Sequence, residues 1–355
     1  MEHAPARVYR NRRYRISIVS ILQRPLQSAK LITNSCPTPA WLPNGHIQTI
    51  YAAKCIKAKQ PRFKRQRLNT PDLDFLDLDW LHPSKSLAPS NYGLIILHGL
   101  EGNSQSHYAV AMANFFRKLG WTIVVAHFRG CSGSPNKLPR AYHSGDSRDV
   151  CFIVDQVITA QPDLIWHVAG VSLGGNALLH YLGTGQNIPV DIKACAAICA
   201  PTNLYACGMH LSNSISGKFI YTRHFLATMM PKLIDKAYRF PNDICIDKIK
   251  SIKTLYDFDD IYTAPIHGFE NAIDYWTKAS SGQFLKYINV PTLILNSYND
   301  PFIPAKSLPA PELCSDAITL QRSKSGGHVG FVSGPFPGHL DWLPQQLYNY
   351  FQSLA

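Results

Sequence analysis

The feature that most constrains this 355-residue chain is the segment Gly170-Val171-Ser172-Leu173-Gly174-Gly175. The sequence predicts an apolar strand over 164–170 and a helix over 176–182, so Ser172 lies at a sharp strand-to-helix turn. Such a turn forces strained dihedral angles on the serine and leaves no room for side chains at 170 and 174, which explains the glycines there. It also exposes the serine Oγ at the mouth of the helix dipole. A bare G-x-S-x-G pattern occurs by chance in many proteins, and the flanking strand and helix are what make Ser172 a candidate nucleophile.

A loop suited to binding an oxyanion precedes this turn. The apolar run Leu94–Leu97 is predicted to be a buried strand, and it opens into His98-Gly99-Leu100-Glu101-Gly102-Asn103. We expect the backbone N–H groups of Leu100 and Leu173 to face a developing negative charge, and we favour Leu100 over Gly99. The alternative is a loop whose glycines serve only to turn the chain.

Asp300 is the candidate acid among the aspartates that follow Ser172. It comes after the strand-like run Pro291–Asn296 and is followed by Pro301, so it lies in a loop beyond a strand end. Loops at the carboxyl ends of parallel strands are where α/β proteins place their sites. The alternative is an aspartate that caps a turn before proline.

Two of the 14 histidines follow Asp300. His328 lies among small residues in Ser325–Gly330, which leave an imidazole room to reach the serine, whereas His339 opens the final amphipathic helix and is expected at the surface. Ser172, Asp300 and His328 therefore form the predicted triad. In this interpretation His328 takes the serine proton and returns it to the leaving group, while Asp300 holds the imidazole tautomer.

Length and composition fit one large domain with an insertion, because 355 residues with 46% hydrophobic content can bury a large core. The nine cysteines show no metal-ligand spacing, and Ala194–Ala200, which contains two of them, is predicted to be a buried strand. The chain has no H-E-x-x-H motif, no paired C-x-x-C and no P-loop, so we expect neither a metal nor a cofactor. An odd, unpatterned set of cysteines indicates a reducing compartment.

The charge is concentrated near the N-terminus. Residues 1–70 hold 14 of the 35 Lys and Arg residues and one of the 23 acidic residues, for a net charge of +13. The remainder, with 21 basic and 22 acidic residues, has a net charge of −1. We therefore expect a basic N-terminal arm over 1–40, which would hold the basic excess, and a nearly neutral domain over 41–355.

Within this arm, four arginines (10, 12, 13 and 15) precede the apolar run Ile16–Leu22, which is too short to span a bilayer. A short signal peptide is the alternative interpretation of this run, but no A-x-A-like site follows and the cysteines argue against export. The arm is expected to touch an anionic membrane surface or to be a solvated tail. Nucleic-acid binding is not expected, since no aromatic-interleaved basic motif accompanies the charge.

Elsewhere, strand and helix patterns alternate. Strands predicted near 94–98, 122–126, 164–170 and 194–200 are separated by helical spacing, which indicates a mostly parallel sheet covered by helices on both faces. Residues 63–68 and 73–81 are predicted to form an antiparallel hairpin whose Asp77 and Asp79 lie on a wet face.

The alternation stops between about 203 and 287. The aromatic and methionine residues there have helical spacing, and we interpret the segment as a lid that lines an acyl-chain pocket, with ordinary helix packing as the alternative. These residues are Phe219, Tyr221, Phe225, Met229, Met230, Tyr238 and Phe240.

Several motifs, taken in order, resemble the YheT-like esterase branch of the α/β-hydrolases, which is related to the eukaryotic ABHD lipid hydrolases. The motifs are His98–Gly102, His127–Gly133, Tyr142–Gly145, Gly170–Asn176, Phe258–Asp260 and Gly326–Phe331. The likeness runs from about Trp41 to the last helix, so the arm lies outside it. It implies an α/β-hydrolase fold with a mostly parallel eight-stranded sheet, and a serine esterase with Ser172, Asp300 and His328 at the triad positions. For Arg129 we favour hydrogen bonds that fix its loop over binding of an acidic substrate group.

The expected function is hydrolysis of carboxylic esters through an acyl-serine, on small-molecule substrates with short- to medium-chain or lipid-like acyl groups. The alternatives are an acyltransferase or a lipid-specific (phospho)lipase on the same triad, and a non-catalytic binding module with this fold. We expect a cytoplasmic protein, with a peripheral position at an anionic membrane as the variant that the arm suggests. The natural substrate and the oligomeric state do not follow from the sequence.

Overall fold

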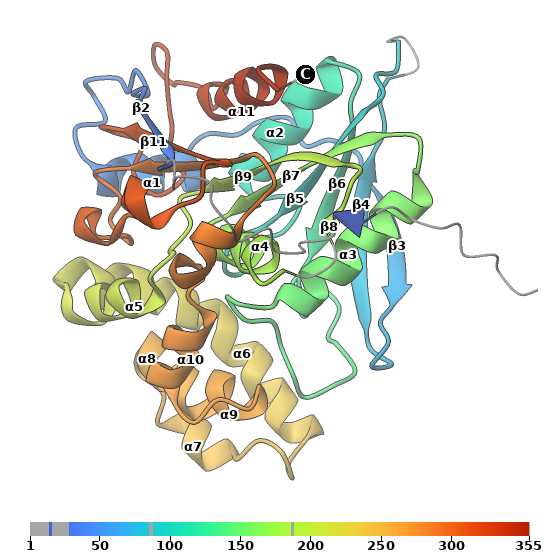
Figure 1. Ribbon diagram of the computed structural model, residues 1–355. Helices are drawn as coiled ribbons and strands as arrows, with labels where there is room; N and C mark the ends of the chain where they lie inside the picture. Colours follow the sequence, from blue (N-terminus) through green and yellow to red (C-terminus); the bar gives the residue numbers. More distant parts are fainter. Residues whose placement is uncertain (1–13, 16–27, 85–87, 186–187, 355) are drawn as a thin grey trace, which may run out of the picture.

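The computed structural model describes residues 14–15, 28–84, 88–185 and 188–354, and its centre is a nine-stranded sheet (Figure 1). The strand order is β2-β11-β10-β9-β7-β5-β6-β4-β3. Neighbouring strands are parallel from β2 to β6, whereas β4 is antiparallel to both of its neighbours, which confirms the predicted mostly parallel sheet. The strands are β2 (Lys30–Thr33), β3 (Lys64–Asn69), β4 (Phe75–Leu81), β5 (Tyr92–Leu97), β6 (Thr122–His127), β7 (Ile165–Val171), β9 (Ile192–Ile198), β10 (Thr292–Ser297) and β11 (Ile318–Ser323). Separately, β1 (Tyr14–Arg15) pairs antiparallel with β8 (Ile188–Pro189).

The ninth strand, β2, lies inside the predicted arm. It runs parallel to β11, with Leu31 opposite Leu320, and the flanking Ala29 and Cys36 are buried. Extending the arm to residue 40 was therefore wrong for residues 29–36, which belong to the folded body. The sequence pattern missed β2 because an edge strand is held by backbone pairing, and this one has no buried side chain to mark it.

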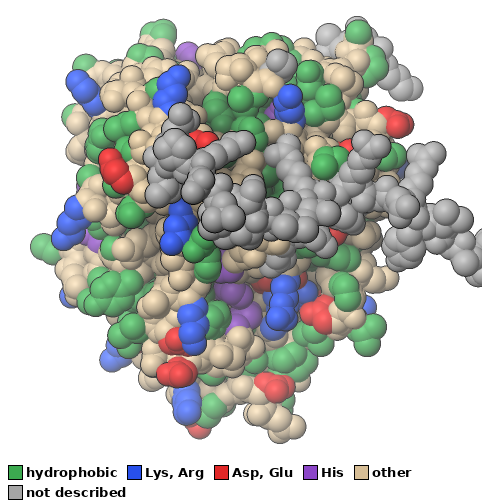
Figure 2. All heavy atoms as spheres, in the orientation of Figure 1, with side chains coloured by type: hydrophobic (Ala, Val, Ile, Leu, Met, Phe, Trp, Pro, Cys, Tyr) green, Lys and Arg blue, Asp and Glu red, His purple; other side chains and the backbone are tan. Residues whose placement is uncertain are grey.

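The assignment of the whole basic excess to the arm was also wrong. Seven of the 14 basic residues in 1–70 lie between Lys54 and Arg67, in α1, in β3 and in the segment between them. On the face drawn in Figure 2, basic and acidic side chains are interspersed among hydrophobic ones. The predicted arginine cluster at 10–13 and the apolar run Ile16–Leu22 lie outside the described residues.

Helices cover both faces of the sheet (Figure 1). On one face, α2 (His107–Lys118) and α11 (Trp342–Gln352) bury Phe116 and Phe351 in a common core. On the other, α3 (Ser147–Ala160) and α4 (Leu173–Gly183) bury Val154 and Leu179. The strand-helix alternation thus gives the layered arrangement that the sequence predicts.

The hairpin of β3 and β4 forms as predicted, but its aspartate face is not wet. Asp77 and Asp79 are 1% and 3% exposed, and they pair with Arg67 at 2.8 Å and Arg65 at 2.7 Å on β3. Asp79 also accepts a hydrogen bond from Ser104 and lies 2.8 Å from His127 Nε2. Although burial alone raises the pKa of Asp79, the hydrogen bonds from Arg65 and these neighbours hold that pKa below its ordinary range. Alternation of apolar and acidic residues along a strand shows that the two faces of the strand have different chemistry. It does not show that the acidic face is exposed to solvent.

Residues 204–287 are mostly helical, as the sequence indicates, and helices α6 to α10 of this segment lie together at the bottom of Figure 1. The elements are α5 (Leu204–Asn213), the π-helix η1 (Gly217–Thr222), α6 (Arg223–Arg239), α7 (Ile246–Lys250), α8 (Leu255–Phe258), the π-helix η2 (Asp259–Thr263), α9 (Ala264–Ile266), α10 (Ala272–Ala279) and the 3₁₀ helix η3 (Ser281–Tyr287). Met229 and Leu233 of α6 and Tyr262 of η2 belong to one cluster of buried side chains, which gives the segment a core of its own. Phe219 and Tyr238 are 66% and 74% exposed, so these two do not line a pocket.

Candidate active site

Ser172 lies in the turn between β7 and α4. Its φ is +52°, a conformation that a residue other than glycine adopts only when its surroundings enforce it. A Cβ at Gly170 would lie 2.4 Å from the Gly174 carbonyl oxygen, and one at Gly174 would lie 2.4 Å from the His98 carbonyl oxygen. Both glycines are therefore required for close backbone approach, as the sequence predicts.

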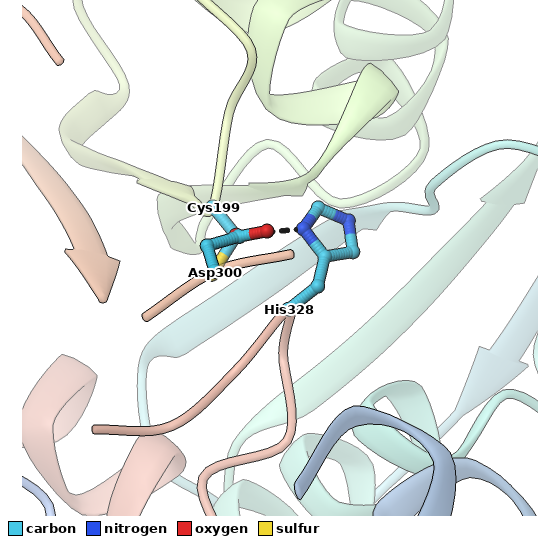
Figure 3. Close-up of side chains that lie close together, drawn as sticks. All are labelled: Cys199, Asp300 and His328. Carbon is cyan, nitrogen blue, oxygen red and sulfur yellow. Dashed lines mark hydrogen bonds and ion pairs between the residues drawn. The ribbon is translucent and has the colours of Figure 1, made fainter. Parts of the chain in front are cut away.

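The structure brings Ser172, His328 and Asp300 together from three strand ends. His328 Nε2 lies 2.8 Å from Ser172 Oγ, and His328 Nδ1 lies 2.8 Å from Asp300 Oδ2, the contact drawn in Figure 3. Because a carboxylate only accepts hydrogen bonds, Nδ1 carries the proton and Nε2 presents its lone pair to the serine. The other oxygen, Asp300 Oδ1, accepts from the backbone N–H groups of Phe302 at 2.7 Å and Ile303 at 3.2 Å. This geometry allows proton transfer from Ser172 to His328.

His339 and the aspartates of the Phe258–Asp260 motif lie outside this group. His339 is exposed and lies 3.2 Å from Asp341, outside this group. Asp259 accepts a hydrogen bond from Trp276 Nε1, and Asp260 accepts one from the Ala272 N–H. Each of these carboxylates therefore has a partner within the helical segment.

Helix α1 (Gly45–Lys54) holds the loops of both Asp300 and His328, and the sequence reasoning missed it. Thr49 Oγ1 accepts the N–H of His328 at 2.8 Å and donates to the Gly45 carbonyl at 2.6 Å. Gln48 Oε1 accepts from the Gly326 N–H at 2.8 Å and from Asn299 Nδ2 at 2.9 Å. The available signal was weak, namely two adjacent polar residues in a helix with little amphipathic character, both of which prove to be buried.

Around Leu100, three neighbouring N–H groups are already bonded. Gly99 N–H donates to Tyr108 Oη at 2.8 Å, Glu101 N–H to Tyr142 Oη at 2.8 Å, and Gly102 N–H to the Gly99 carbonyl at 2.9 Å. Within the described part of the chain, no hydrogen-bond acceptor is found for the N–H of Leu100 or for that of Leu173 at the first position of α4. These two groups are thus available to a ligand, whereas Gly99 is not.

His98 holds the loop that contains Leu100 through hydrogen bonds of its imidazole ring. Its Nε2 accepts the Phe128 N–H at 3.0 Å, so Nδ1 must be the protonated nitrogen and donates to the Gly99 carbonyl at 2.7 Å. Burial lowers the pKa of His98 to about 3, so the ring stays neutral at physiological pH. The fixed tautomer joins the loop after β5 to the loop after β6.

Arg129 ties down its own loop. It is 4% exposed, and its guanidinium contacts Asp149 at 2.7 Å, Asp72 at 3.0 Å and Asp74 at 3.3 Å. The guanidinium is paired with these three carboxylates. The contacts therefore support a role in fixing the loop over a role in binding an acidic substrate group.

Cys199 adds a thiol beside the acid and the histidine (Figure 3). The Cys199, Asp300 and His328 ligand atoms lie within 4.8 Å of one another, a grouping that can hold a metal ion. Burial, together with the charge of Asp300, raises the pKa of the thiol well above its ordinary value, so the sulfur is a protonated, poor ligand. The direct Asp300–His328 hydrogen bond already accounts for the proximity of those two residues.

A cavity of about 440 Å³ adjoins the two available N–H groups, because Leu100 and Leu173 line it. Its other walls are formed by helix α6, by the loop over 129–143 and by residues of α8, η2 and α10. Met229, which the sequence analysis names, lines the cavity together with Leu233 and Phe258. The volume lies within the range of small-molecule sites, and the apolar walls suit a hydrocarbon chain.

No helix in the described parts of the chain is both long and apolar enough to cross a bilayer.

Comparisons with known proteins agree with this architecture. Residues 93–335 match the family described as alpha/beta hydrolase fold. The chain is 35% identical over 309 residues to the "Putative esterase YheT" of Escherichia coli (strain K12), covering 86% of this chain and 89% of that protein. It is 26% identical over 332 residues to "Phospholipase ABHD3" of Homo sapiens, covering 92% and 80%.

Among solved structures, the esterase Pf2001 of Pyrococcus furiosus has a TM-score of 0.53 at 16% identity, over 84% of this chain and 95% of that one. Alpha/beta hydrolase domain-containing protein 10 from mouse has a TM-score of 0.51 at 18% identity, over 82% and 100%. At these identities the structures show a shared fold. Together with the family match and the similarity to YheT, they establish that this chain belongs to the α/β-hydrolase fold family, in the branch that includes YheT.

Proposed function

We propose that the protein is a serine hydrolase that cleaves carboxylic esters through an acyl-serine. The observation that carries the proposal is the continuous hydrogen-bond chain Ser172–His328–Asp300, with 2.8 Å at each link, next to the unoccupied N–H groups of Leu100 and Leu173. This arrangement combines a nucleophile, a base, an orienting acid and two oxyanion donors.

In the first half-reaction, Ser172 Oγ attacks the ester carbonyl carbon while His328 Nε2 takes the serine proton. The carbonyl π electrons move to oxygen, and the oxyanion accepts hydrogen bonds from Leu100 and Leu173 N–H. When the tetrahedral intermediate collapses, the bond to the alcohol oxygen breaks and Nε2 returns the proton to that oxygen. The products of this half are the free alcohol and the acyl-serine.

In the second half-reaction, water replaces the alcohol. His328 removes a proton from the water as it attacks the acyl carbon, and then protonates Ser172 Oγ as the acid departs. Asp300 keeps Nδ1 protonated and stabilises the imidazolium that exists in each half. Neither half requires a metal or a cofactor.

A lipid-specific (phospho)lipase is the second candidate, supported by the apolar cavity beside Leu100 and by the name of the relative ABHD3. The helical segment 203–287 would act as the lid over that cavity. An acyltransferase differs only in the acceptor that replaces water, and a binding module would keep the fold without turnover.

The N-terminal residues suggest a further proposal, that they hold the protein at an anionic membrane surface inside the cell. It is supported by the excess of arginines before residue 28.

The test of function is labelling with a fluorophosphonate probe, followed by a panel of p-nitrophenyl esters of increasing acyl length. Wild-type protein should be labelled and should hydrolyse the panel, with Ser172→Ala losing both. Turnover of long acyl chains over short ones would favour the lipase. Release of p-nitrophenol only when an alcohol is added, with formation of the new ester in place of free acid, would indicate an acyltransferase. A folded protein that is neither labelled nor active would leave the binding module.

A further inference from the structure

Four Lys and Arg side chains line the cavity beside Leu100, and three of them are paired with carboxylates. Arg129 contacts three aspartates, Lys232 lies 2.7 Å from Glu101, and Arg239 lies 3.4 Å from Asp235. The fourth, Lys236 on α6, forms no ion pair with any described residue. It is only 8% exposed.

Lys236 has an incomplete set of partners. Its Nζ donates to the backbone carbonyls of Leu138 at 2.7 Å and Arg140 at 3.1 Å. An ammonium has three N–H donors, so one remains beyond these two. Burial lowers the pKa of Lys236 to about 8, and the charge of Asp74, which forms no ion pair with it, only partly offsets the lost hydration. An anionic ligand group can provide the ion-pair partner that a buried cation on the wall of a cavity lacks.

The cavity also constrains the rest of the ligand. The same cavity is lined by Leu100 and Leu173, by Lys236 and by the apolar side chains of Met229, Leu233 and Phe258. Three carboxylates also line the cavity, and each has a partner: Glu101 is paired with Lys232, Asp235 with Arg239, and Asp259 is bonded to Trp276. A ligand that extends from the Leu100 and Leu173 N–H groups, next to Ser172, into this cavity therefore meets apolar side chains and the ammonium of Lys236.

We propose that the natural substrate is an amphiphilic ester bearing a carboxylate or phosphate at the end of an apolar chain, and that Lys236 binds this anion. This inference rests on the proposed esterase function. In this proposal Lys236 determines the selectivity for charged over neutral esters, and Ser172 and His328 cleave the ester bond.

The anionic chain can belong to the acid or to the alcohol of the ester, and two pairs of substrates distinguish these sources. For the acid side, mono-p-nitrophenyl suberate is compared with p-nitrophenyl octanoate, with adipate and sebacate monoesters added to vary the reach. For the alcohol side, the butanoate ester of hydroxyhexanoic acid is compared with hexyl butanoate in a pH-stat. In each pair the measured quantity is the ratio of kcat/KM for the anionic ester to that for the neutral ester.

Three variants are compared with wild type at pH 7. Lys236→Met should lower this ratio by about tenfold in one of the two pairs, since a hydrogen bond to a charged group is lost. Lys236→Arg keeps the charge and should retain most of the ratio. Lys278→Met removes the same charge from an exposed position on α10, where the lysine pairs with Asp274, and should leave the ratio unchanged.

Hydrolysis of the neutral ester by Lys236→Met serves as the check that the variant is folded and that the serine chemistry is intact. If wild type hydrolyses neutral esters while Lys236→Met leaves the ratio unchanged in both pairs, the assignment of Lys236 is wrong although the esterase proposal stands. If no ester is hydrolysed and Ser172 is not labelled, the esterase proposal itself fails. Should Lys236→Met unfold, the proposal is tested with Lys236→Arg and with inhibition of the wild-type protein. Octanoate and neutral octanol are compared as inhibitors of p-nitrophenyl octanoate hydrolysis. Inhibition by octanoate that is no stronger than inhibition by octanol overturns the proposal.

Discussion

Thr49 Oγ1 accepts the main-chain N–H of His328 at 2.8 Å, although 279 positions separate the two residues in the chain. The same hydroxyl donates to the Gly45 carbonyl one helical turn earlier, so it is fixed in α1. A Cβ at Gly327 would lie 2.5 Å from both the Gly45 carbonyl oxygen and Thr49 Oγ1, so α1 and the histidine loop are in close contact. The position of the imidazole therefore depends on a helix near the other end of the chain.

Replacement of Thr49 by valine should lower kcat for p-nitrophenyl esters by about tenfold with little change in KM. Valine keeps the shape but leaves the buried His328 N–H without an acceptor, which costs about 1–3 kcal/mol. Thr277→Val is the matched control, because Thr277 Oγ1 also donates to a carbonyl four residues earlier yet is exposed on α10. Equal kcat values for the two variants would remove the positioning role.

Ser172→Ala should abolish fluorophosphonate labelling and lower kcat by up to ~10⁶, as in other triads. The thermal unfolding temperature should change little, because the substitution removes one partly buried hydroxyl whose side-chain contact is with His328. Residual activity close to that of wild type would remove Ser172 from the mechanism.

Asp300→Asn should lower kcat by about 10⁴, because an asparagine can present its amide N–H to Nδ1 and favour the wrong imidazole tautomer. The controls are Asp259→Asn and Asp260→Asn, whose carboxylates bind groups of the helical segment. Greater damage from either control than from Asp300→Asn would show that the acid has been misassigned.

The preference for anionic esters should fall as pH rises through about 8. Lys236 carries its charge below this pKa, and kcat/KM reports the free enzyme, so the anionic-to-neutral ratio should be high at pH 7 and low at pH 9. The charged groups that act on Lys236 are Asp74 and Asp235, which raise its pKa, and Arg129 and Arg239, which lower it. The ratio cancels effects of pH on Ser172 and His328. A ratio that is flat from pH 7 to 9 would contradict the role of this ammonium.

Deletion of residues 1–13 should weaken co-sedimentation with anionic vesicles and leave hydrolysis of a short soluble ester unchanged. The deletion removes Arg7, Arg10, Arg12, Arg13 and Glu2, and each basic residue near such a surface contributes about 1 kcal/mol. Salt should weaken the binding of the full chain, since the Debye length is roughly 8 Å at physiological ionic strength. Equal pelleting of both proteins, or pelleting of neither, would mean that the arm is a solvated tail.

Local patterns in the sequence were sufficient for much of the fold. Eight of the nine strands of the main sheet, the helices on its two faces and the turn at Ser172 follow from short apolar runs, helical spacing and paired glycines. The order of Ser172, Asp300 and His328 after successive strands also allowed these residues to be selected, because the carboxyl ends of parallel strands meet along one edge.

Tertiary structure alone decided the features that depend on distant backbone or on charge pairing. The edge strand β2 is held by backbone pairing with β11, so its side chains do not need the apolar pattern by which a buried strand is recognised. In the sequence Asp77 and Asp79 have the pattern of solvent-facing residues. In the structure they are buried and paired with Arg67 and Arg65. Neither the contact of Thr49 with His328 nor the unpaired burial of Lys236 leaves a local signal, because each depends on which segments pack together. A sequence records which side chains a segment carries, whereas only the folded chain determines which partners those side chains lack.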